Sequence, residues 1–115
     1  MSVSTHVLDA SVGAPASGVP VTLARQAGSW LDVESGVTDA DGRHRFVADT
    51  PAGTYRLTFE TGGYFAARVV ATFYPEVAIT FTIPQPADGP AGGVTGHFHV
   101  PLLLSPFAYS TYRGS

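Results

Sequence analysis

The chain has 115 residues with six Arg, no Lys, nine acidic residues and no Cys, which gives a net charge of −3. This length predicts one domain over residues 1–115, which can bury about two-thirds of its unfolded surface without disulfide or metal support. Thiolate nucleophiles, Cys-ligated zinc and lysine Schiff bases are excluded, and no basic patch is available for a nucleic acid.

Short runs of Val, Thr, Phe and Tyr, separated by 13 Gly and nine Pro, predict an all-β sandwich or barrel. Pro20 lacks a backbone N–H, so we expect its strand to have a free edge there. In chain order the predicted strands are Ser4–Leu8, Val19–Arg25, Trp30–Val37, Arg43–Ala48, Thr54–Glu60, Val77–Ile83, a strand from His97 or His99 to Leu104, and Tyr109–Arg113.

The connections are predicted from turn-forming residues. Asp9–Gly18 is a turn-rich connection, and Asp39–Gly42 is the strongest turn signal in the chain. Tyr64–Thr72 is the plausible helix, and Thr61 is a candidate for its N-cap. Pro84–Gly96 holds three Pro and four Gly and is predicted to be a surface loop. The sequence therefore predicts eight strands and one short helix.

Two histidines near the C-terminus are candidates for chemistry. His97 and His99 lie two residues apart on a predicted strand, so their side chains share one face. They are possible metal ligands, but no third ligand is nominated, and a metal-free pair with one reactive and one exposed or structural ring is favoured. His6, inside the first strand, becomes a candidate proton carrier if it meets His99 in space.

Arginine and tyrosine supply further candidates. Arg43 and Arg45 share a face of their strand, with His44 on the other, so the pattern does not choose between them. The guanidinium of each is either a solvated cation in a turn or a fixed set of N–H donors that binds a planar ligand. Tyr112 shares a face with Ser110 and is either half-buried packing or a donor to a developing oxyanion.

The C-terminal segment His97–Ser115 contains two His, an apolar quartet, two Tyr and an Arg. Chain termini are usually polar and frayed. Ordering such a segment costs conformational entropy, which contacts with the rest of the protein must offset. We therefore expect the segment to be packed.

Five stretches of the sequence resemble one family. The most specific is the terminal tetrapeptide Tyr112-Arg113-Gly114-Ser115, which transthyretin proper, the hormone carrier, lacks. The resemblance is to the 5-hydroxyisourate hydrolases, the transthyretin-related enzymes of urate breakdown, and it runs from Ser4 to Ser115. The stretches that carry it are Ser4–Asp9, Gly18–Leu23, Thr38–Arg43, Phe73–Glu76 and His99–Ser115.

The resemblance implies a transthyretin-like sandwich of two four-stranded sheets with one short helix. It also implies a homotetramer with active sites in a channel at the dimer–dimer interface. The implied reaction is metal-independent and cofactor-free hydrolysis of 5-hydroxyisourate to 2-oxo-4-hydroxy-4-carboxy-5-ureidoimidazoline, with water attack assisted by histidine.

The resemblance also assigns residue roles. It selects Arg43 over Arg45 and His99 over His97. The implied catalytic residues are His6, Arg43, His99 and Tyr112, and the implied substrate-binding residues are His6, Arg43, Tyr112 and Ser115.

Non-catalytic alternatives fit part of the pattern. The first sixty residues also resemble prealbumin-type sandwich modules, and a transthyretin-like ligand carrier is a further alternative. Neither explains the joint presence of His6, Arg43, His99 and Tyr112 with the terminal tetrapeptide. No apolar run approaches the roughly 20 residues of a membrane span and no secretory signal is recognisable, so we expect a cytoplasmic protein without membrane contact.

Overall fold

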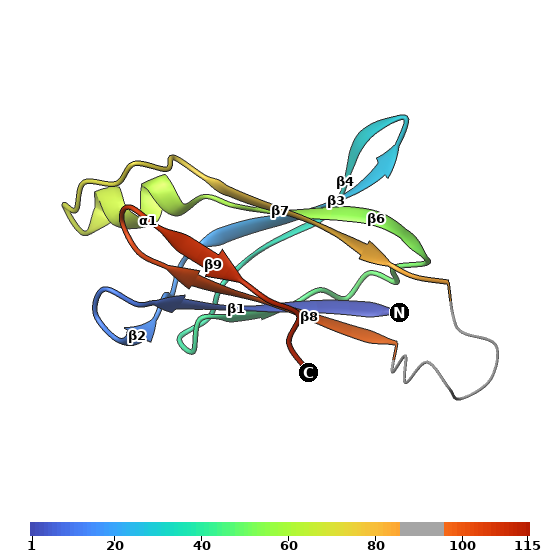
Figure 1. Cartoon of the computed structure of the whole chain (residues 1–115), viewed down its shortest axis with the longest axis horizontal. Helices are drawn as coiled ribbons and strands as arrows, with labels where there is room; N and C mark the ends of the chain where they lie inside the picture. Colours follow the sequence, from blue (N-terminus) through green and yellow to red (C-terminus); the bar gives the residue numbers. More distant parts are fainter. Residues whose placement is uncertain (86–95) are drawn as a thin grey trace.

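The computed structural model describes residues 1–85 and 96–115, and it consists of two β-sheets packed face to face (Figure 1). One sheet has the order β2-β1-β8-β9 with β5 also paired to β1, and the other has the order β4-β3-β6-β7. The elements are β1 (Ser2–Asp9), β2 (Ala14–Pro15), β3 (Pro20–Ala27), β4 (Ser29–Val37), β5 (Arg43–Arg45), β6 (Gly53–Phe59), α1 (Thr61–Ala67), β7 (Val77–Ile83), β8 (His97–Leu104) and β9 (Tyr109–Thr111).

The core fills the space between the sheets and follows from alternation along the strands. Every second residue of β1 is buried, and β6 buries Tyr55, Leu57 and Phe59 in the same way. The inward residues are mostly apolar, with Thr5 and Asp9 as polar exceptions on β1. The intervening residues of β1, and those of the first half of β8, lie on the outer face of their sheet. That outer face carries the histidines.

The predicted all-β sandwich with one short helix is confirmed, but the strand count is not. Of the described residues, one sheet has five strands, because Ala14–Pro15 pairs with the end of β1 inside the predicted connection. β5 ends at Arg45, short of the predicted Ala48. The backbone N–H groups of Val47 and Ala48 donate instead to the carboxylate of Glu34 at 2.8–3.1 Å, which replaces a strand partner.

The expectation of a free edge at Pro20 is wrong, because β3 lies between β4 and β6 inside its sheet. Pro20 is the first residue of β3, a position where a missing donor is tolerated. Its carbonyl accepts a hydrogen bond from the Glu60 N–H at 3.0 Å.

The helix lies earlier than predicted. It spans Thr61–Ala67 rather than Tyr64–Thr72, and Thr61 is its first residue rather than its cap. It ends because Val69 adopts the left-handed conformation, with φ of 57°. The N–H groups of Val69 and Val70 then bond back to Ala66 and Phe65, each at 3.0 Å, in a Schellman motif. The predicted loop Pro84–Gly96 falls mostly on residues 86–95, outside the described residues.

A buried hydrogen bond fixes the helix to β1. The Tyr64 hydroxyl donates to Oδ2 of Asp9 at 2.8 Å, and the Ser11 hydroxyl donates to Oδ1 at 2.5 Å. Burial alone would raise the pKa of Asp9, but the hydrogen bonds from Ser11 and Tyr64 lower it. Burial, followed by the bond to Asp9, raises the pKa of Tyr64 to about 12. The last residue of β1 is thus anchored to α1.

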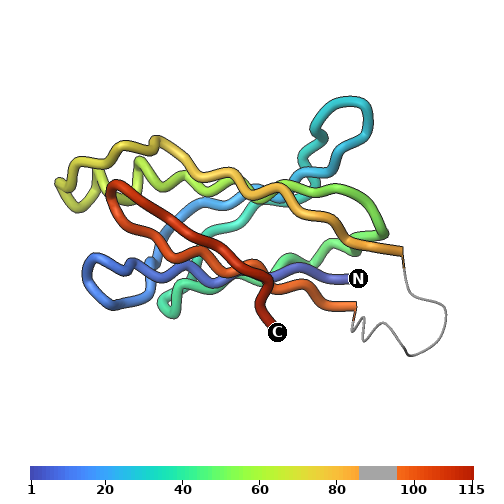
Figure 2. The backbone as a smooth tube through the Cα atoms, viewed as in Figure 1, coloured from blue at the N-terminus to red at the C-terminus, as the bar shows by residue number. Residues whose placement is uncertain are grey.

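Two segments extend from the body of the sandwich. The β3–β4 hairpin projects at one side, and the C-terminus crosses toward the outer face of the β1–β8 sheet (Figure 2). Of the C-terminal segment, β8 is packed as expected, with Phe98, Val100, Leu102 and Leu104 in the core. The part after β8 pairs with it through β9 but is exposed rather than packed, with Tyr112 59% exposed. No helix in the described ranges is long and apolar enough to cross a membrane.

The left-handed Val69 yields a stability prediction. A left-handed residue other than Gly costs about 1–2 kcal/mol, and Val69 is 94% exposed, so its side chain contributes little packing. We expect Val69→Gly to raise the free energy of unfolding by up to about 1 kcal/mol after the entropy cost of Gly is subtracted. Urea unfolding measures the change. Val47→Gly is the control, because Val47 is also exposed but does not have a positive φ. It should lower the free energy of unfolding. A decrease for both variants would contradict the left-handed conformation of Val69.

Candidate active site

The site is built on the parallel pairing of β1 with β8. Their register places Ser4 beside His99 and His6 beside Pro101. Because both strands run in the same direction, the outward residues of β1 form a row next to the outward residues of β8. All three histidines named in the sequence analysis as candidates therefore lie on one outer face, and each is half-buried.

Arg43, the first residue of β5, reaches the same face directly after a turn. Oδ1 of Asp39 accepts the N–H groups of Asp41 at 2.9 Å and Arg43 at 3.0 Å. The pKa of Asp39 is lowered mainly by the hydrogen bond from Arg43. Gly42, with φ of 75°, lies against the carbonyl of Val7, where a side chain would collide with backbone. This turn sets Arg43 opposite His6 in the sheet.

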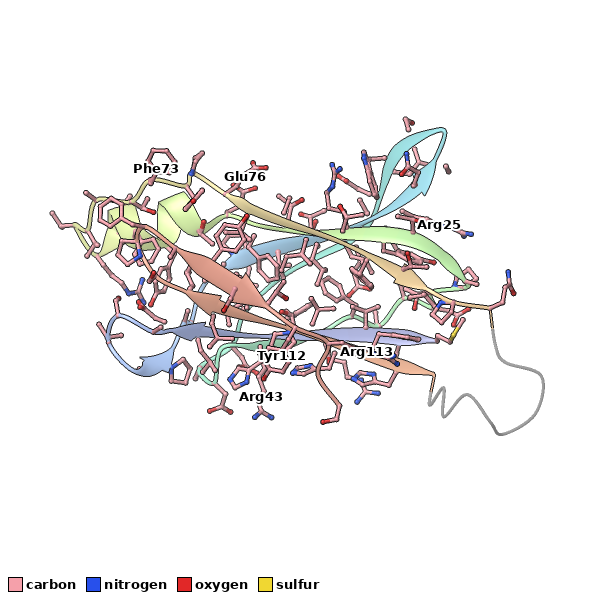
Figure 3. All side chains as sticks on the ribbon, in the orientation of Figure 1. Arg25, Arg43, Phe73, Glu76, Tyr112 and Arg113 are labelled. Atoms are coloured by element: carbon pink, nitrogen blue, oxygen red, sulfur yellow. The ribbon has the colours of Figure 1, made fainter. Side chains whose placement is uncertain are left out.

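A pocket of about 380 Å³, here called the outer-face pocket, joins these groups. Arg43, His99 and Ser115 line it, so three of the five predicted site residues share one cavity. Arg43 projects away from the second sheet (Figure 3). The structure brings Arg45 as well as Arg43 to the pocket, and the further lining residues are Ser4, Asp39, His44 and His97.

The electrostatic environment favours a neutral His99. Burial is the main cause that lowers its pKa below the ordinary 6.5, and the positive charges of His6, His97 and Arg43 lower it further. His6 does not line the outer-face pocket, but it is near enough for its charge to act on His99. A neutral imidazole retains a lone pair that can accept a proton.

Tyr112 lies apart from this pocket. It lines a neighbouring cavity of about 420 Å³, here called the edge cleft, together with Phe81, Phe98 and Arg113. The guanidinium of Arg113 stands 5.2 Å from the Phe98 ring centroid. His99 lines both cavities, so it is the link between Tyr112 and the outer-face pocket. The catalytic role of Tyr112 stays a prediction.

The last residues of the chain contact His99 directly through Gly114. The Gly114 N–H donates to the carbonyl of His99 at 2.9 Å. A Cβ at Gly114 would lie 2.5 Å from Cδ2 of the His99 ring. The absence of a side chain at this position therefore lets the chain end pass beside the imidazole and carries Ser115 into the outer-face pocket.

Two serines that the sequence reasoning missed bind the histidine pair. Ser2 Oγ lies 2.7 Å from Nδ1 of His97, and Ser4 Oγ lies 2.9 Å from Nε2 of His97 and 2.8 Å from Nδ1 of His99. Their alternate spacing with His6 on β1 was the available signal, but it is informative only once β8 is known to be the neighbour. Within residues 1–85 and 96–115, no group of three or more His, Cys, Asp or Glu is arranged to hold a metal ion.

Comparison with known proteins places the chain in a family. The model of the HIUase/Transthyretin family matches residues 3–114. The chain belongs to this family. The 5-hydroxyisourate hydrolase of Salmonella typhimurium is 41% identical over 116 residues, which span 97% of this chain and 79% of the relative.

Solved structures agree with this membership. The structure of Klebsiella pneumoniae 5-hydroxyisourate hydrolase matches with a TM-score of 0.82 at 40% identity. The match covers 99% of this chain and 93% of the Klebsiella chain. Sea bream transthyretin in complex with thyroxine has the same TM-score of 0.82 at 31% identity, covering 97% and 93%. The fold is common to both, whereas sequence identity to the hydrolases is higher.

The lowered pKa of His99 predicts a pH dependence. The His99 ring takes up a proton less readily in the folded protein than in the unfolded chain. Its contribution to the free energy of unfolding is therefore complete above pH 6.5 and is lost as pH falls through the folded pKa. An NMR titration of the His99 ring should give a midpoint below 6.5. Arg43→Gln should move the midpoint upward. A wild-type midpoint above 6.5 would contradict this assignment.

Proposed function

We propose that this protein hydrolyses 5-hydroxyisourate to 2-oxo-4-hydroxy-4-carboxy-5-ureidoimidazoline. The observation that carries the proposal is the grouping of His99, Arg43 and Ser115 in one pocket on a chain 41% identical to a named hydrolase over nearly its whole length. Neither the carrier alternative nor a non-catalytic module requires an imidazole that is kept neutral in the same pocket as a guanidinium.

The proposed mechanism uses side chains of this chain. One imidazole, His99 or His6, takes a proton from water as the water oxygen attacks the substrate carbonyl carbon. The ring C–N bond then breaks and the leaving nitrogen is reprotonated. Arg43 orients the planar substrate and, with the Tyr112 hydroxyl, stabilises the oxyanion, where such donors contribute about 3 kcal/mol each. Ser115 completes the binding surface.

We further propose that the protein assembles as a homotetramer with the sites at the dimer–dimer interface. Support comes from β7 and β9, which lie at the ends of the strand orders in the described sheets. Free edges and exposed large apolar side chains favour association. Phe107 and Tyr109 are exposed in the single chain, as is Tyr112. Assembly would also bring a second chain toward the edge cleft. A cytoplasmic location stays a prediction.

The function is tested by generating 5-hydroxyisourate in situ from urate and following its decay. The protein should accelerate decay, and a chelator should leave the rate unchanged. His6→Ala and His99→Ala should each lower kcat by about 100-fold or more, the usual contribution of a proton-transfer group. Size-exclusion chromatography should show an unaltered assembly. No acceleration over the spontaneous rate would refute the hydrolase, and loss of assembly would make the two histidines structural.

The close approach of Gly114 to His99 gives a second, steric test. Gly114→Ala should displace the His99 ring and lower kcat/KM by about tenfold or more, because small misplacements of catalytic groups are costly. Gly63→Ala is the matched control, since a Cβ there meets nothing within 4 Å. It should preserve activity and raise helix stability slightly. Full activity in Gly114→Ala would contradict the placement of His99.

A further inference from the structure

The geometry points to a positioning role for His97, Ser2 and Ser4. We propose that they form a hydrogen-bond chain that fixes the tautomer of His99, with the proton on Nδ1 and the lone pair on Nε2. This inference rests on the proposed function only for its catalytic consequence. His97 does not touch the substrate in this scheme; it acts through Ser4.

The chain consists of three short hydrogen bonds between β1 and β8. Ser2 Oγ and His97 Nδ1 are 2.7 Å apart, His97 Nε2 and Ser4 Oγ are 2.9 Å apart, and Ser4 Oγ and His99 Nδ1 are 2.8 Å apart. Both ring nitrogens of His97 are thus engaged by hydroxyls. The parallel register, which sets Ser2 beside His97 and Ser4 beside His99, holds all four side chains in a row.

Counting protons leaves two self-consistent directions for the chain, and the hydrogen of the Ser2 hydroxyl decides between them. A serine hydroxyl has one hydrogen, and a neutral imidazole has one N–H and one acceptor nitrogen. Ser2 Oγ also lies 3.5 Å from the carbonyl of Gly96, which can only accept. If Ser2 donates to that carbonyl, His97 Nδ1–H donates to Ser2, Ser4 donates to His97 Nε2, and His99 Nδ1–H donates to Ser4. His99 Nε2 is left as the acceptor, which is the direction we propose. In the reverse direction, with Ser2 donating to His97 Nδ1, the proton of His99 lies on Nε2, and the tautomer of His99 distinguishes the two.

The surroundings of His99 are consistent with a neutral ring of this form. The groups that face it are His6 from β1, His97 from β8 and Arg43 from β5. Asp39 and Ser115 line the same outer-face pocket. The hydrogen bond made by one ring nitrogen determines which form of a neutral histidine is populated. Without Ser4, the ring would relax toward the form protonated on Nε2, which free histidine prefers in water.

Long-range ¹H–¹⁵N NMR of the full-length protein without substrate measures the tautomer directly. In the wild type, His99 should carry its proton on Nδ1. Ser4→Ala and His97→Phe should shift the population toward the Nε2-protonated form, and Ser4→Thr, which keeps the hydroxyl, should restore the wild-type form. Ser35→Ala is the matched control, because that hydroxyl bonds Thr22 on the other sheet.

Kinetics provide the second readout. Ser4→Ala and His97→Phe should lower kcat by about 10–100-fold, the usual effect of losing a group that orients an active ligand, with little change in KM. Ser35→Ala should change neither the tautomer nor kcat. Circular dichroism identifies a misfolded variant. If Ser4→Ala or His97→Phe misfolds, the other variant and the wild-type tautomer test the inference.

The outcomes separate this inference from the proposed function. A wild-type His99 protonated on Nε2, or a tautomer unchanged in both folded variants, overturns the inference whatever the activity. A wild type that leaves 5-hydroxyisourate decay unaccelerated overturns the function, while the tautomer measurement still supports the hydrogen-bond chain.

Discussion

The parallel pairing of β1 with β8 is the constraint on which the site depends. A slip of one residue would turn every side chain of β1 to the opposite face. His6 would then enter the core, and the fully buried Val3 and Val7 would enter solvent. Burial of these two valines therefore enforces the register, and the same register aligns Ser2 and Ser4 with the two histidines of β8. Core packing and site geometry are set by one arrangement of hydrogen bonds.

Alternation along single strands was predictable from the sequence, and neighbour relations between strands were not. The pattern correctly placed His97 and His99 on one face, and Arg43 and Arg45 opposite His44. It could not show that β1 lies beside β8, because these strands are about 95 residues apart in the chain and leave no local signal. The contribution of Ser2 and Ser4 was missed for that reason.

Errors in element boundaries have causes that residue propensity does not show. β5 ends early because the carboxylate of Glu34, on a different strand, takes the N–H groups that would have continued it. The helix ends early because Val69 adopts a conformation that its side chain disfavours, which no propensity scale predicts. At β5 the local preference yields to a contact from another strand, and at Val69 it yields to the hydrogen bonds of the Schellman motif.

The buried link between Asp9 and Tyr64 separates the titration of the scaffold from that of the site. The carboxyl of Asp9 stays ionised well into acid, and the hydroxyl of Tyr64, with a pKa of about 12, keeps its proton well into alkali. The contribution of Asp9 to stability is present above its ordinary pKa of 3.8 and is lost only as pH falls through its lower folded value. The anchor at the end of β1 is therefore insensitive to pH across the range in which imidazoles gain and lose protons. Changes in behaviour near neutrality therefore do not arise from this anchor.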